Sequence, residues 1–121
     1  MRLWLTEGIP FAFGNYPVAY EEMRGWLGAR LTVCPKQITL LGSGRIGFSL
    51  TRARFGRPFG HDSDLDLSIV SDTLFHRFAE AFGRWKQDYS EGAIRPRNDT
   101  ERTYWNQNLQ FGEKNLPLGF F

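Results

Sequence analysis

The stretch from Gly60 to Val70, GHDSDLDLSIV, contains the residues of this chain most suited to chemistry. Acids occupy alternate positions, Asp62, Asp64 and Asp66, and apolar residues follow them. Because side chains alternate along a strand, Asp64 and Asp66 are expected to project from one face, about 6–7 Å apart. Two carboxylates at that spacing repel each other, and a divalent cation neutralises the repulsion. Mg²⁺ prefers oxygen ligands, so this pair predicts a site for Mg²⁺ or Mn²⁺.

A glycine-rich turn, GSGRIG from Gly42 to Gly47, precedes the acids in the chain. It follows ITLL, residues 38–41, a short continuous apolar run that is typical of a buried strand. Backbone N–H groups and a hydroxyl at the start of such a turn can bind a phosphate. We therefore predict that Gly42 and Ser43 bind a phosphate, with Arg45 as the neighbouring cation.

Three better-known phosphate or metal motifs do not match. A dinucleotide-binding fold needs a helix after the glycines and an acid after the next apolar strand. Here Gly56, Pro58 and Gly60 intervene, and the acids precede the apolar residues. The Gly-Lys-Ser/Thr of an ATPase phosphate loop is absent from this turn. A calcium loop starting at the first acid needs glycine and glutamate where Leu67 and Thr73 stand.

The surrounding sequence predicts the elements that position these residues. Helical spacing of apolar residues predicts helices over residues 17–31, 71–86 and 100–111. Strands are predicted over residues 38–41 and 64–70, and a short helix can start within the glycine-rich turn.

Two glycines, Gly25 and Gly28, lie inside the first predicted helix. Each weakens a helix by about 1 kcal/mol relative to alanine. Tertiary packing is therefore expected to hold this helix in place.

Length and composition indicate a single folded domain. The chain has 121 residues, enough for one core, and 41% of them are hydrophobic, which argues against disorder. The order of elements predicts an α/β (α+β) domain with a small mixed sheet flanked by helices. We assign one domain over residues 1–121, with a motif core over 38–70 and a tail of weaker signal over 87–121.

LLGSGRIGFSL followed by DSDLDLSIV resembles the DNA polymerase beta-like nucleotidyltransferase superfamily, as a small bacterial-type member. The shared signature is Gly-Ser after an apolar residue, a spacer, and Asp-x-Asp between apolar residues. The resemblance implies a nucleotidyltransferase-like fold, in a minimal or incomplete version. It also implies that Asp64 and Asp66 bind the catalytic metals, and that Gly42 and Ser43 contact a nucleoside triphosphate.

The spacer is longer than in most members of that superfamily. Twenty residues separate Ser43 from Asp64. The excess resembles a basic insertion around residues 51–60, which carries Arg52, Arg54 and Arg57. It either covers a polyphosphate or nucleic acid, or forms a solvated loop.

The second departure from the family pattern concerns a third acid. The family usually takes this acid from a later strand to activate the attacking hydroxyl. The acids after Lys86 all stand in polar or helical sequence: Asp88, Glu91, Asp99, Glu101 and Glu113. Either an unpredicted strand supplies the acid or the chain lacks it.

Two function hypotheses follow from these residues. The first is a metal-dependent enzyme that transfers a nucleotidyl group from a nucleoside triphosphate to a protein hydroxyl, an RNA end or a nucleotide. The second is a catalytically silent nucleotidyltransferase-like module that binds or regulates through a partner.

Compartment and partners are predicted from simpler features. No apolar run approaches the roughly 20 residues of a membrane span, and the N-terminus lacks a signal-peptide pattern, so a cytoplasmic protein is expected. Cys34 is the single cysteine, and a buried thiol is expected there. The apolar ending at Phe120 and Phe121 favours a partner subunit or self-association.

Overall fold

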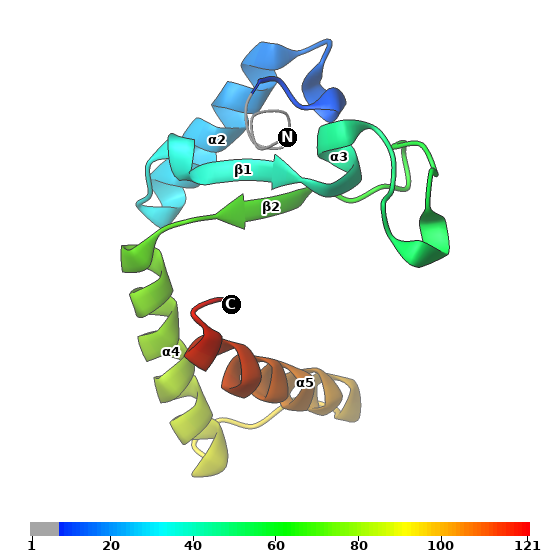
Figure 1. The fold of residues 1–121 in the computed structure, drawn as a ribbon. Helices are drawn as coiled ribbons and strands as arrows, with labels where there is room; N and C mark the ends of the chain where they lie inside the picture. Colours follow the sequence, from blue (N-terminus) through cyan, green and yellow to red (C-terminus); the bar gives the residue numbers. More distant parts are fainter. Residues whose placement is uncertain (1–7) are drawn as a thin grey trace. The chain divides into compact units, whose positions relative to one another are not determined.

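The computed structural model describes residues 8–121, which form a small mixed α/β structure (Figure 1). Four helices and a two-stranded antiparallel sheet make up this part of the chain. The predicted α/β class is confirmed at this level, and the nucleotidyltransferase-like fold stays a prediction. In chain order the elements are η1 (Phe11–Phe13), α2 (Pro17–Leu31), η2 (Pro35–Gln37), β1 (Ile38–Leu41), α3 (Gly42–Ile46), η3 (Arg52–Arg54), β2 (Asp66–Ile69), α4 (Asp72–Ser90), α5 (Asp99–Asn115) and η4 (Leu116–Leu118).

The chain divides between Ser71 and Asp72 into two compact units. Unit 1 contains the elements from η1 to β2, and with them every predicted site residue. Unit 2 contains α4, α5 and η4. The single domain over residues 1–121 stays a prediction, because two compact units can belong to one domain.

The sheet of unit 1 consists of β1 and β2 in antiparallel register. Ile38 lies opposite Ile69, and Leu41 lies opposite Asp66. The side chains of Ile38 and Leu40 are fully buried, so β1 forms the centre of this unit's core. The strand predicted over residues 38–41 is confirmed, but its burial alternates: Ile38 and Leu40 are buried, whereas Leu41 is exposed.

The second strand is shorter than the predicted strand over residues 64–70. β2 begins at Asp66, so the prediction is wrong at its start. The reason lies in the partner strand. β1 ends at Leu41, where Gly42 turns the backbone to φ +62°, and the register therefore gives residues 64 and 65 no partner on β1.

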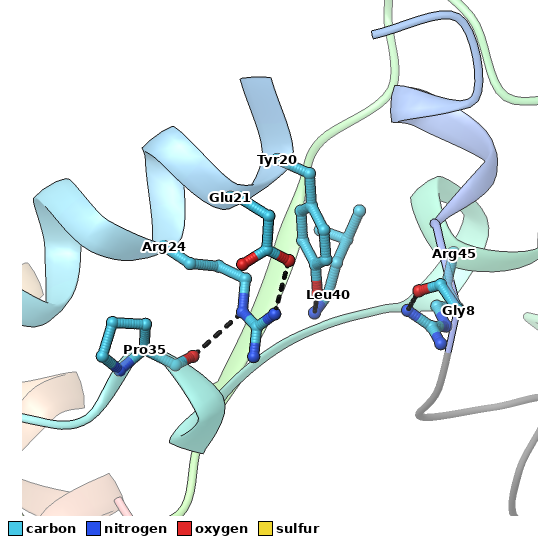
Figure 2. A network of polar contacts seen from close by, with 7 residues as sticks. All are labelled: Gly8, Tyr20, Glu21, Arg24, Pro35, Leu40 and Arg45. Atoms are coloured by element: carbon cyan, nitrogen blue, oxygen red, sulfur yellow. Dashed lines mark hydrogen bonds and ion pairs between the residues drawn. The ribbon is translucent and has the colours of Figure 1, made fainter. Parts of the chain in front are cut away.

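Helix α2 packs against β1 and η2 through polar as well as apolar contacts (Figure 2). The backbone N–H of Leu40 donates a hydrogen bond to the buried Tyr20 hydroxyl at 3.4 Å. Arg24 Nε donates to the carbonyl oxygen of Pro35 at 2.9 Å, and the Arg24 guanidinium lies 5.2 Å from the centre of the Tyr20 ring. The hydrogen bonds with Leu40 and Pro35 contribute to the tertiary packing expected for this glycine-containing helix, whereas the Arg24–Tyr20 contact lies within α2.

The two glycines of α2 have different surroundings. A Cβ on Gly28 would lie 2.7 Å from the carbonyl oxygen of Val33 and 3.3 Å from the ring of Pro35. A Cβ on Gly25 would meet nothing within 4 Å. Gly28 therefore allows the chain after α2 to turn back close to the helix, whereas Gly25 weakens the helix and permits no such contact.

Cys34, just before η2, is exposed. The prediction of a buried thiol is therefore wrong. Cys34 stands in a surface turn before η2, where its backbone N–H donates to Gln37 Oε1 at 2.9 Å.

Unit 2 confirms the two predicted helices after residue 70 and extends both of them. Rings from α4 and α5 pack together, with centroids 5.7 Å apart for Trp85 and Trp105 and 5.2 Å apart for Tyr89 and Trp105. The two helices approach closely at Gly112, where a Cβ would fall on the ring of Phe82. This unit contains no predicted site residue.

Candidate nucleotide and metal site

The register of the sheet brings the two halves of the predicted motif together. β1 ends at Leu41, opposite Asp66, and α3 begins with the next residue, Gly42. The Gly-Ser turn and the second acid of Asp-x-Asp therefore meet at one end of the strand pair (Figure 1). They are more than twenty residues apart in the chain.

Gly42 lies directly against the carboxylate of Asp66. A Cβ on Gly42 would stand 2.5 Å from Asp66 Oδ2, closer than real Cβ atoms approach other atoms, and 3.4 Å from its Cγ, an ordinary contact. The φ of Gly42 is +62°, in the left-handed region that favours glycine. Both facts explain why glycine stands here: it leaves space in which the carboxylate rests beside the backbone of the turn.

Gly44 comes two residues after Gly42 and lies against apolar side chains. A Cβ there would meet Leu65 at 3.2 Å, Leu40 at 3.3 Å and Phe59 at 3.4 Å. This contact seats the short helix α3 on the sheet and so fixes the position of Gly42. Leu65 itself remains 45% exposed.

The three acids have different local structures. Asp66 is the first residue of β2, and Asp64 precedes the strand with an exposed side chain. Strand alternation therefore does not set the direction of the Asp64 side chain. The expectation that Asp64 and Asp66 project from one face of a strand does not hold, because Asp64 lies before the strand. Asp62 lies 3.8 Å from Arg57 in an exposed ion pair.

Ser43 and Arg45 both belong to α3. Ser43 is half-buried, and its carbonyl oxygen accepts a hydrogen bond from the Gly47 N–H at 2.8 Å. The Arg45 side chain is buried, and its Nη1 donates to the carbonyl oxygen of Gly8 at 3.3 Å (Figure 2). Arg45 thus joins α3 to the segment before η1, and its contact with a nucleotide stays a prediction.

Asp64 and Asp66 are the residues that could hold a divalent cation. Among residues 8–121, no three or more His, Cys, Asp or Glu side chains gather so that they could hold a metal ion. Two carboxylates still fit Mg²⁺, which commonly takes one or two protein carboxylates and completes its shell with water and substrate phosphates.

The third acid of the family pattern was expected on a later strand. After β2, the described chain forms α4, α5 and η4 and contains no further strand. Asp88, Asp99 and Glu101 lie in or at the start of these helices.

The chain between α3 and β2 has more structure than a basic loop. The Ser49 N–H donates to the Arg57 carbonyl at 2.9 Å, and the Phe59 N–H donates to the Gly47 carbonyl at 2.8 Å. The sequence gives only a weak signal for this pairing, namely a glycine between two short segments. That glycine, Gly56, has φ +77° in the turn that the segments flank. Sequence reasoning identified its arginines but missed its hydrogen-bonded stem.

Comparison with protein-family models, with curated proteins and with solved structures found no match. The site is therefore interpreted from its own residues and geometry. None of the helices in residues 8–121 combines the length and the apolar character needed to cross a membrane.

Proposed function

We propose that this chain is a metal-dependent nucleotidyltransferase, which transfers a nucleotidyl group from a nucleoside triphosphate to an acceptor hydroxyl. The observation that carries the proposal is the contact between Gly42 and the Asp66 carboxylate. A phosphate-binding turn and a metal-binding acid then lie side by side, as a metal-bound triphosphate requires. The acceptor class remains a protein hydroxyl, an RNA end or a nucleotide.

Each site residue has a role in this proposal. The N–H groups of Gly42 and Ser43 and the Ser43 hydroxyl would bind phosphate oxygens. Arg45 would add positive charge beside them. Asp64 and Asp66 would hold Mg²⁺ or Mn²⁺, which when bound would neutralise phosphate charge and stabilise the leaving pyrophosphate.

The reaction would be an in-line displacement at phosphorus. The acceptor oxygen would form a bond to the α-phosphorus, and the bond from that phosphorus to pyrophosphate would break. The acceptor proton would pass to a base. The chain's contribution would be to hold the triphosphate in line with the acceptor, because positioning and charge stabilisation dominate phosphoryl-transfer catalysis.

A second candidate function is a catalytically silent nucleotide-binding module that acts through a partner. It is favoured by one observation: the described chain after β2 is helical, whereas the family takes its third acid from a later strand. Such a module would bind metal and triphosphate at the same residues and release no pyrophosphate.

Incubation with α-labelled nucleoside triphosphates, with and without Mg²⁺ or Mn²⁺, tests both functions. The wild type should label an acceptor or release pyrophosphate, and the Asp64→Ala/Asp66→Ala variant should lose at least 100-fold of this activity. Asp62→Ala is the matched control, since that acid pairs with Arg57 and is assigned no metal. It should keep the activity.

Equilibrium binding of the same nucleotides separates the two candidates. Metal-dependent binding that requires Asp64 and Asp66, without transfer to protein, RNA or nucleotide acceptors, would favour the silent module. Absence of both transfer and binding would reject the two proposals together.

A further inference from the structure

The chain between α3 and β2 carries a second candidate surface, which we call the arginine loop, residues 47–59. Its two sides pair through the Ser49–Arg57 and Phe59–Gly47 hydrogen bonds and through a bridge between Phe48 and Pro58. The Gly56 N–H closes the tip by donating to the Ser49 carbonyl at 2.8 Å. Figure 1 shows this segment extending from the end of the sheet that carries α3.

The base of the arginine loop is packed, whereas its tip is exposed. Phe59 at the base makes an edge contact with Phe11, with ring centroids 6.4 Å apart, and also lies near Gly44. At the tip the Phe55 side chain is 74% exposed. This large apolar ring is held at the tip by a hydrogen-bonded stem, so a ligand can reach it. Because the ring is exposed, its packing contributes little to the stability of unit 1.

The charge of the arginine loop is positive only. From Gly47 to Phe59 the sequence contains three arginines and no acid. Arg52 and Arg54, on either side of Ala53 in η3, are exposed and form no ion pair within residues 8–121. Arg57 is half-exposed beside Asp62. The tip therefore presents unpaired guanidinium groups next to an exposed aromatic ring.

We propose that the arginine loop binds single-stranded nucleic acid, with phosphates on Arg52, Arg54 and Arg57 and one base stacked on Phe55. Arginines neutralise backbone phosphates, and aromatic rings stack on bases that are not already stacked in a duplex. A duplex offers phosphates but no free base face, and an acidic peptide offers charge but no ring to stack. The combination of charge and exposed ring favours the single strand.

This surface is distinct from the nucleotide and metal site, although the chain leads from both ends of the loop to the elements that carry that site, α3 and β2. Binding of a single strand requires neither the metal nor a triphosphate. The proposal therefore stands or falls independently of nucleotidyl transfer, and the Asp64→Ala/Asp66→Ala variant should still bind the strand.

Fluorescence anisotropy with labelled 20-nucleotide oligouridine and oligothymidine, in metal-free buffer at 50–200 mM salt, tests the proposal. Each phosphate contact contributes about −0.7 to the slope of log affinity against log salt for single strands. Three contacts predict a slope of about −2 for the wild type, and Arg52→Ala/Arg54→Ala should reduce it to about −0.7. Phe55→Ala should weaken binding by about 5- to 150-fold, the effect of one lost stacked base, and leave the slope unchanged.

Matched controls come from exposed residues of unit 2. Arg84→Ala/Arg95→Ala removes the same charge, and Tyr104→Ala removes an aromatic ring that is 66% exposed. Both variants should bind like the wild type. Circular dichroism should show that all variants keep the wild-type helix content.

The proposal is overturned if the wild type binds neither strand, or if the unit 2 variants lose as much affinity as the loop variants. It is also overturned if a duplex of the same length or polyglutamate competes as well as oligouridine, because binding would then depend on charge alone. A preference between oligouridine and oligothymidine supports it, because charge alone would not distinguish the two strands.

Discussion

Three acids at alternate positions share a sequence pattern but differ in their surroundings. All three acids are exposed: Asp66 lies against Gly42 at the end of the sheet, Asp64 precedes the strand, and Asp62 pairs with Arg57. An exposed ion pair at 3.8 Å contributes little to stability. Of the three acids, Asp66 is therefore the one whose position is tied to the turn at Gly42.

Replacement of Gly42 by alanine tests that contact. The Cβ would meet the Asp66 carboxylate and would also impose a cost of about 1–2 kcal/mol for a left-handed backbone. We expect at least a tenfold loss of affinity for metal-bound nucleoside triphosphate, measured by isothermal titration calorimetry. Gly119→Ala is the control, because Gly119 has φ +83° and open space around it. Equal effects of the two variants on nucleotide affinity would contradict the role assigned to the contact.

At the scale of elements, glycines decide how closely segments approach one another. In α2, Gly28 faces the returning chain at Val33 and Pro35, whereas Gly25 faces open space. In unit 2, Gly112 lets α5 approach the ring of Phe82 on α4. The same residue type therefore weakens a helix at one position and permits its packing at another.

Alanine at the two glycines of α2 should change stability in opposite directions. Gly25→Ala removes a helix-weakening residue without a clash and should raise the free energy of unfolding by about 1 kcal/mol. Gly28→Ala places a methyl group 2.7 Å from the Val33 carbonyl and should lower it, because overpacking typically costs about 1–3 kcal/mol. Thermal unfolding followed by circular dichroism measures both. A stabilising Gly28→Ala would show that the turn after α2 adjusts freely.

At the scale of the whole molecule, the chain forms two compact units, and all the predicted site residues lie in the first. Unit 1 combines a two-stranded sheet with α2 and α3, and unit 2 is a helical pair with an aromatic interface. A ligand at the candidate site is therefore expected to stabilise unit 1 directly.

Ligand-dependent stabilisation tests this division. A nucleoside triphosphate with Mg²⁺ at 100 times its dissociation constant should add about 2.7 kcal/mol to the free energy of unfolding. Differential scanning calorimetry should show the transition that includes unit 1 shifting to higher temperature. The Asp64→Ala/Asp66→Ala variant should show no shift. A shift of the same size in that variant would place the bound nucleotide elsewhere in the chain.

Local patterns in the sequence determined most of the elements. Apolar spacing located α2, α4 and α5, and the continuous apolar run ending at glycine located β1, because these signals depend on neighbours a few residues away. The Gly-Ser and Asp-x-Asp residues were identified as candidates in the same way. The burial of Cys34 was predicted wrongly, since burial depends on what packs over a residue.

Only the tertiary structure decided where β2 begins and which acid meets the turn. Because β1 ends at Leu41, before Gly42, residues 64 and 65 have no partner on it, and the register then places Asp66 beside the turn. The stem of the arginine loop was likewise decided by hydrogen bonds between residues about ten positions apart. Pairing between distant residues depends on loop closure and packing of the whole unit, which no local pattern contains.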